Sequence, residues 1–70
     1  MTKPTRVTNR IRELRLSAGL SQAELAQRIG VTRQTVNAIE GGKYSPSLEA
    51  AFLIARVLRR PLDEVFDYPE

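Results

Sequence analysis

The chain has 70 residues, contains neither cysteine nor histidine, and carries a formal net charge of +3. A chain of this length forms one domain at most, and without these residue types it has no disulfide, no thiolate zinc site and no histidine general base. We therefore expect no cofactor, no bound metal and no enzymatic activity. The most apolar stretch, residues 48–58, is too short to span a bilayer, and residues 1–10 lack the apolar core of a signal peptide, which indicates a cytoplasmic protein without membrane contact.

The charge is distributed unevenly along the chain. Residues 61–70 hold four acidic residues and no basic one, whereas residues 1–60 hold all 11 basic residues and the other four acidic ones. The last ten residues thus carry a net charge of −4, and residues 1–60 carry a net charge of +7. A basic body favours an anionic partner such as nucleic acid. A basic surface that only keeps a small protein soluble explains the same charge, so charge alone leaves both interpretations open.

The chain begins with a predicted arm and two predicted helices. Residues 1–8 show no periodicity and are expected to form a flexible arm. Apolar residues on one helical face predict a first helix over 8–18. Ser21 followed three residues later by Glu24 is a capping box that starts the second helix, and Gly30 ends it.

The third helix follows the second after a short turn. Thr32 is its predicted cap, and the helix is expected over residues 33–40. Two short helices joined by a glycine-containing turn of about three residues are typical of a helix-turn-helix. We place this motif at residues 21–40.

Two further helices complete the predicted fold. Ser47 caps a helix over 48–59, and a short fifth helix is expected over 61–66. The chain then ends in a short acidic tail, residues 67–70. We predict an all-α fold, a compact five-helix bundle, with one domain over residues 9–66.

The outward face of the third helix has side chains suited to DNA bases. With Val36 at the centre of the buried side, this face holds Arg33, Gln34, Thr35, Asn37 and Ala38. Gln and Asn match adenine in the major groove, Arg matches guanine, and Ala packs against the thymine methyl group. Within this helix no carboxylate precedes Glu40, so none of these outward side chains repels phosphates. A polar surface without a partner is the alternative.

Glu40 lies on the inner side of the third helix, where an unpaired acid is costly. Arg15 lies near the end of the first helix and off its solvent face. We predict a partly buried ion pair between Arg15 and Glu40 that links the two helices. The alternative is that both side chains extend into solvent.

Four segments together resemble a known family. They are LSQAELA (20–26), GVTRQTV (30–36), IEGGK (39–43) and PSL (46–48). In this combination they are similar to the Cro/cI (Xre-type) helix-turn-helix family of phage repressors and small regulators, over residues 9–66. The resemblance implies a lambda-repressor-like fold and a transcriptional regulator, most simply a repressor, that binds specific double-stranded DNA in the nucleoid with helix 33–40 in the major groove.

The resemblance also implies roles for single residues. Base contacts are implied for Arg33, Gln34, Asn37 and Ala38. Ala38 occupies a base-contacting position that is often held by a longer residue, which shifts weight to Arg33 and Asn37. Phosphate contacts are implied for Gln22, Thr32, Thr35, Lys43 and Tyr44. Arg15 and Glu40 match a family ion pair, in agreement with the pairing predicted above.

The expected assembly is a homodimer on a near-palindromic operator. Its surface is predicted from Leu53, Val57, Phe66 and Tyr68, although Phe66 is equally compatible with a place in the core. Contact with RNA polymerase is a further expectation for such a regulator. The alternative function is an antitoxin-like or other protein-interaction module, which holds a toxin and also binds its own promoter.

Overall fold

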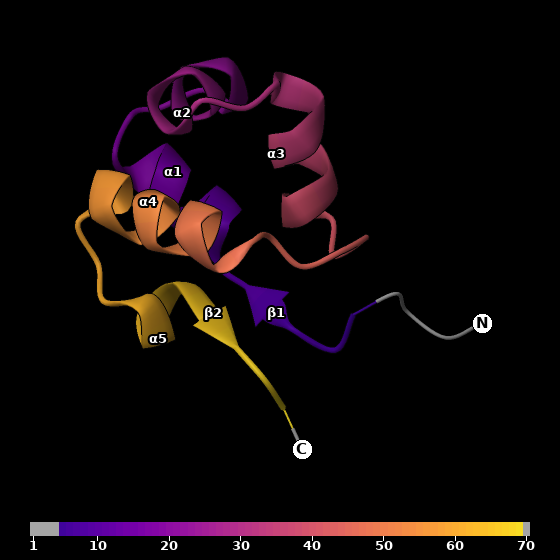
Figure 1. Ribbon diagram of the computed structural model, residues 1–70. Coiled ribbons are helices and arrows are strands. Elements are labelled where there is room, and N and C mark those ends of the chain that lie inside the picture. Colours follow the sequence, from indigo (N-terminus) through magenta and orange to yellow (C-terminus); the bar gives the residue numbers. More distant parts are fainter. Residues whose placement is uncertain (1–4, 70) are drawn as a thin grey trace.

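The computed structural model describes residues 5–69 as five helices and a short two-stranded sheet (Figure 1). The elements in chain order are β1 (Thr8–Asn9), α1 (Ile11–Ser17), α2 (Gln22–Ile29), α3 (Arg33–Glu40), α4 (Leu48–Leu58), α5 (Leu62–Val65) and β2 (Phe66–Asp67). The predicted all-α architecture of five helices is confirmed. Residues 1–4 of the predicted arm and residue 70 of the predicted tail lie outside the described residues.

A single core joins the five helices. Each helix contributes one large side chain with an exposed fraction below 2%, namely Ile11, Leu25, Val36, Ile54 and Val65. Smaller or less completely buried apolar side chains surround them, among them Leu14, Leu20, Ala26, Ile29 and Ile39. Burial of this apolar surface is the main force that holds the helices together. Because Val36 and Ile39 belong to it, the core fixes which side of α3 faces outward.

Local capping defines where α2 and α3 begin and end. Ser21 Oγ accepts a hydrogen bond from the Glu24 N–H (3.0 Å), and the Ser21 N–H donates to Glu24 Oε1 (2.9 Å), which forms the expected capping box. Gly30 ends α2 with a φ of +76°, a conformation that glycine adopts without a Cβ clash. Thr32 Oγ1 then accepts from the Thr35 N–H (3.1 Å) at the start of α3. These caps produce the predicted helix-turn-helix.

The sequence did not predict the antiparallel pairing of β1 with β2. Thr8 lies opposite Asp67 and Asn9 opposite Phe66, and the Arg10 N–H donates to the Val65 carbonyl (2.9 Å). Two-residue strands are too short to show the alternation that marks a strand in sequence. The pairing shortens two predicted helices: α1 begins at residue 11 instead of 8, and α5 ends at residue 65 instead of 66.

The apolar surface of α4 differs from the prediction. Leu53 and Val57 were predicted to contribute to the dimer surface, but both are half-buried against the core. Leu48 and Phe52 are instead 70% and 55% exposed. The reason is helix geometry: at 100° per residue, Phe52 points about 160° away from the fully buried Ile54, whereas Leu53 and Val57 flank the buried face.

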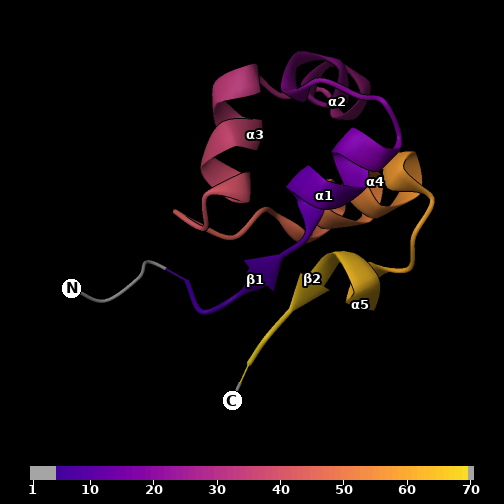
Figure 2. The same ribbon diagram turned by 180° about the vertical axis from the view of Figure 1, so that it is seen from behind.

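The helix α3 and the pair formed by α5 and β2 lie at opposite ends of the molecule. Figure 1 and the reverse view in Figure 2 both show α3 at one upper corner, with α5 at the opposite lower corner. The helix α4 lies between them. One end of the molecule therefore presents α3, and the other presents α5 and β2.

Candidate nucleic-acid interface

The outward side of α3 forms a polar surface. Arg33, Gln34 and Asn37 are exposed, and Ala38 is half-buried beside them. All four come from a helix of two turns, Arg33–Glu40, whose opposite side is held in the core by Val36 and Ile39. This surface offers a guanidinium, two amides and a methyl group, which match the edges of bases in a major groove.

A buried ion pair joins α1 to the end of α3. Arg15 Nε lies 2.8 Å from Glu40 Oε2, and Arg15 Nη2 lies 3.3 Å from Glu40 Oε1. The two side chains are only 8% and 7% exposed. The third nitrogen, Arg15 Nη1, donates to the Leu20 carbonyl (3.0 Å), which also ties down the segment before α2. Charge-assisted pairs with two parallel bonds are directional, so this contact sets how α3 lies against α1.

Gln22 lies next to this ion pair, at the first residue of α2. Its Nε2 donates to Glu40 Oε1 (3.2 Å) and to Asn37 Oδ1 (3.3 Å). The resemblance implied a phosphate contact for Gln22 and a base contact for Asn37, and the structure brings the two side chains into contact. The side-chain nitrogen of Gln22 is therefore occupied in the free protein. Its backbone N–H belongs to the first turn of α2, where such groups lack an intrahelical partner and suit an anion.

The two threonines at the start of α3 share a hydrogen bond. Their hydroxyl oxygens, Thr32 Oγ1 and Thr35 Oγ1, are 3.0 Å apart. Because one hydroxyl proton lies between them, the other remains able to donate outward. This pair can offer one hydrogen bond to a phosphate, not the two independent ones that the sequence suggests.

The loop after α3 places Lys43 and Tyr44 at the surface. Both are exposed, and the Lys43 N–H donates to the Ala38 carbonyl (3.0 Å). Gly42 has a φ of +73°, which turns the chain sharply away from the helix. A cation and a phenol hydroxyl thus lie beside the C-terminal end of α3.

Asn9 was not predicted as a site residue, yet it holds the end of α3. Its Nδ2 donates to the Ile39 carbonyl (2.9 Å), and its Oδ1 accepts from the Ile11 N–H (3.1 Å). One side chain thereby accepts from the first N–H of α1 and binds the last turn of α3. No local sequence signal marked this role, because Asn9 lay inside the predicted helix over 8–18 and its carbonyl partner is 30 residues away.

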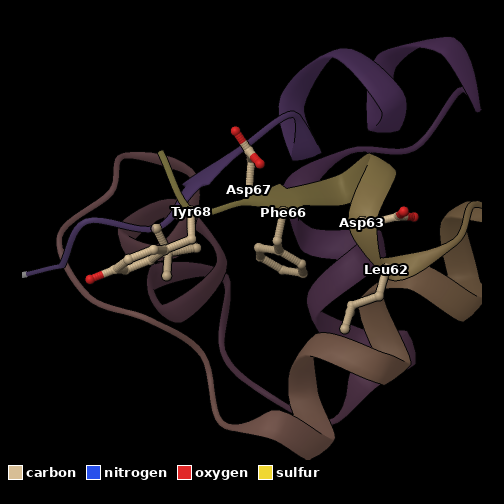
Figure 3. A pocket seen from close by; sticks show the side chains of 6 residues that line it. Leu62, Asp63, Phe66, Asp67 and Tyr68 are labelled. Carbon is tan, nitrogen blue, oxygen red and sulfur yellow. The ribbon is translucent and has the colours of Figure 1, made fainter. Parts of the chain in front are cut away.

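Two of the four residues predicted for a dimer surface, Phe66 and Tyr68, lie in or just after β2 at the end of the molecule away from α3, and the other two lie on α4. Tyr68 is 62% exposed, whereas Leu53, Val57 and Phe66 are half-buried. Phe66 packs against the core and also lines a surface hollow together with Leu62 and Tyr68 (Figure 3). In the same view, Leu62 and Phe66 point to one side of the chain and Asp67 points to the other.

Comparison with known proteins assigns the class. The helix-turn-helix family model HTH_3 matches residues 11–65. An uncharacterized HTH-type transcriptional regulator of Methanothermobacter thermautotrophicus is 56% identical over 57 residues, which cover 80% of this chain and 83% of that protein. The cryptic phage CTXphi transcriptional repressor RstR of Vibrio cholerae is 38% identical over 58 residues, which cover 83% of this chain and 52% of the repressor.

A solved structure agrees with these sequence matches. The restriction-modification controller protein C.AhdI from Aeromonas hydrophila superposes with a TM-score of 0.71 at 37% sequence identity, over 77% of this chain and 78% of that one. The chain belongs to the Cro/cI-type helix-turn-helix family, whose members are DNA-binding transcriptional regulators. The predicted family is thus confirmed. Within residues 5–69, no helix is long and apolar enough to cross a membrane.

Proposed function

We propose that this regulator binds a specific double-stranded DNA sequence by placing α3 in the major groove. The observation that carries the proposal is the outward side of α3, where Arg33, Gln34 and Asn37 are exposed and no carboxylate lies among them. These side chains contact base edges. Ala38, which is half-buried, contributes apolar contact to a thymine methyl group and no hydrogen bond.

Phosphate contacts flank this helix. The backbone N–H of Gln22 and the shared hydroxyl donor of Thr32 and Thr35 lie at the starts of α2 and α3, while Lys43 and Tyr44 follow α3. Contacts of this kind position a protein on the duplex and supply affinity that does not depend on base sequence. The residues of the helix-turn-helix thus divide into base-contacting and phosphate-contacting groups.

We further infer that two copies of the chain bind together, related by a two-fold axis. A single module makes few base contacts, and two-fold dimers contact two half-sites one helical turn apart. The proposed interface centres on Leu48 and Phe52 of α4, which are highly exposed for apolar side chains. Beside them lie apolar hollows lined in part by Leu53, Leu62 and Phe66. Tyr68 borders this surface, and Val57 lies outside it, in a separate hollow beside Leu20.

Charge on α4 supports a second copy as the occupant of this surface. Glu49 and Arg56 border the same hollow as Phe52. They are seven residues apart, so they share one helical face with Phe52 near the midpoint. If two α4 helices cross antiparallel at Phe52, Glu49 of each copy faces Arg56 of the other. A self-complementary patch of this kind is what a two-fold interface requires.

The dimer is tested by sedimentation of Phe52→Glu, with Leu16→Glu as the matched control. Leu16 on α1 is 60% exposed, close to the 55% of Phe52, but lies outside the proposed surface. We expect the wild type and Leu16→Glu to sediment as dimers and Phe52→Glu as a monomer. A Phe52→Glu protein with unchanged mass would contradict the interface.

Regulation then follows from occupancy of the operator. A protein bound across a promoter excludes RNA polymerase, so repression is the simplest outcome, and the relative RstR is named a transcriptional repressor. The proposal is tested by selecting bound duplexes from a random DNA pool. We expect one enriched near-palindrome with half-sites about 10 base pairs apart. Binding without any enriched sequence would overturn specific recognition.

A further inference from the structure

A chain of hydrogen bonds joins Arg15 to Asn37 through Glu40 and Gln22. The charges of Arg15 and Glu40 fix which atom donates and which accepts at each step. Arg15 can only donate, and the Glu40 carboxylate can only accept. The two are joined by contacts of 2.8 and 3.3 Å and are over nine-tenths buried. In both contacts Arg15 therefore donates and Glu40 accepts.

Because Glu40 can only accept, its contact with Gln22 also fixes which amide atom of Gln22 faces it. The Gln22 side-chain atom 3.2 Å from Glu40 Oε1 must be the amide nitrogen, because a carboxylate oxygen repels the carbonyl oxygen of an amide. The same nitrogen lies 3.3 Å from the side chain of Asn37. Both protons of Gln22 Nε2 are thereby used, and the atom of Asn37 that faces Gln22 must be Oδ1.

We propose that this chain makes Asn37 a donor-only contact to DNA bases, with Gln22 as the residue that positions it. Oδ1 of Asn37 is turned toward α2, so Nδ2 is the group left for a base. An asparagine that binds adenine through both atoms must present Oδ1 and Nδ2 together. A donor-only Asn37 instead prefers guanine, which offers the acceptors O6 and N7, and disfavours cytosine, which offers only a donor.

The inference rests on the proposed binding of α3 in the major groove and adds the base preference of one residue. The base pair that Asn37 contacts is identified as the position whose preference disappears in selections with Asn37→Ala. For the wild type we expect guanine there. In Gln22→Met the amide of Asn37 is free to turn, and we expect the preference to move toward adenine by about tenfold. Gln27→Met, an exposed glutamine elsewhere on α2, is the control and leaves guanine preferred.

Asn37→Asp tests the same chain of hydrogen bonds by changing Asn37 and leaving Gln22 in place. In this variant the carboxylate oxygen that faces α2 still accepts from Gln22, while the outer atom changes from a donor to an acceptor. We expect the preferred base to change from guanine to cytosine, whose N4 amino group donates. Retained preference for guanine in this variant would overturn the proposal, as would selection of adenine by the wild type.

A spectrum of the free protein separates this inference from the proposed function. In a ¹⁵N–¹H spectrum, Gln22→Met shifts the side-chain amide signals of Asn37, whereas Gln27→Met leaves them in place. Unchanged Asn37 signals in Gln22→Met would show that no such chain exists and overturn the inference, even if DNA binding is specific. If the signals shift but no sequence is enriched by the wild type, the proposed function fails, and the base preference fails with it.

Discussion

Arg15 and Glu40 form a two-point ion pair between α1 and α3, with Nε to Oε2 at 2.8 Å and Nη2 to Oε1 at 3.3 Å. The third guanidinium nitrogen, Nη1, donates to the Leu20 carbonyl, and the Glu40 carboxylate also accepts from Gln22 Nε2. No buried polar side-chain atom within residues 5–69 is left without a partner. The pair therefore couples the orientation of α3 to α1 and α2 without an unsatisfied charge.

Removing one partner of this ion pair should be strongly destabilising. Arg15→Leu leaves a buried carboxylate without its counter-charge, and we expect a loss of about 3–5 kcal/mol in the free energy of unfolding. The double variant Arg15→Leu/Glu40→Leu removes both charges and should recover most of that loss. Urea unfolding of both proteins measures the difference. If the double variant is less stable than Arg15→Leu, the pair is not the main source of the effect.

Asn9 should matter more for stability than its neighbour Thr8. Asn9→Ala leaves the Ile11 N–H without a partner and removes one of the two hydrogen bonds to the Ile39 carbonyl, which keeps the bond from the Gly42 N–H, and we expect a cost of about 1–3 kcal/mol. Thr8→Ala removes only a 3.4 Å exposed hydrogen bond to the Asp67 carbonyl and should cost less than about 0.5 kcal/mol. Thermal unfolding of the two variants gives the comparison. Equal losses would mean that Asn9 does not hold the end of α3.

Acid should weaken the start of α2. Hydrogen bonds from the Ser21 backbone and then its side chain hold the pKa of Glu24 below its ordinary value. A carboxyl with a lowered pKa in the folded state stabilises the protein above the pKa of the unfolded chain, and this contribution is lost as pH falls through the folded-state pKa. Glu24→Gln keeps the capping geometry without the titration.

The corresponding measurement is stability against pH for the wild type and Glu24→Gln. We expect the wild type to be the more stable protein near neutral pH and to lose this advantage between about pH 5 and 3, so that the variant shows the smaller loss. Parallel curves through this range would show that Glu24 contributes nothing to the acid response.

Lys43 should contribute affinity without specificity. Lys43→Ala removes one phosphate contact, so binding weakens on all sequences, and the slope of log K against log salt falls by about one unit. Arg28→Ala is the control, because it also removes one exposed positive charge, from the last turn of α2. Arg28 borders a hollow with Val57 and Leu58 that no residue of α3 lines. Titrations at several salt concentrations compare the two. A change in the preferred DNA sequence of Lys43→Ala would place this residue among the base contacts.

Local signals in the sequence predicted the helix-turn-helix well. The caps at Ser21 and Thr32 depend on neighbouring residues only, and the glycine at the end of α2 has the left-handed conformation that its position predicts. The contact between Arg15 and Glu40 could also be predicted, since an acid on a buried helical face requires a cation and Arg15 was the available one.

Contacts between distant segments were not predictable from these signals. The pairing of β1 with β2 joins residues near the two ends of the chain, and Asn9 reaches a carbonyl 30 residues away. On α4, almost every position is apolar, so hydrophobicity alone could not show that Phe52 lies outside and Leu53 against the core. Which amide atom of Asn37 faces outward likewise depends on side chains from three helices.

The most direct test of DNA recognition by α3 is the ratio of affinities for the selected operator and a scrambled duplex, measured for the wild type and Gln34→Ala at one salt concentration. We expect a ratio of about 1,000 or more for the wild type. Gln34→Ala should lose about 1–3 kcal/mol on the operator and little on the scrambled duplex, so that the ratio falls. Equal losses on both duplexes, or a wild-type ratio near one, would contradict the assignment of α3 as the base-contacting helix.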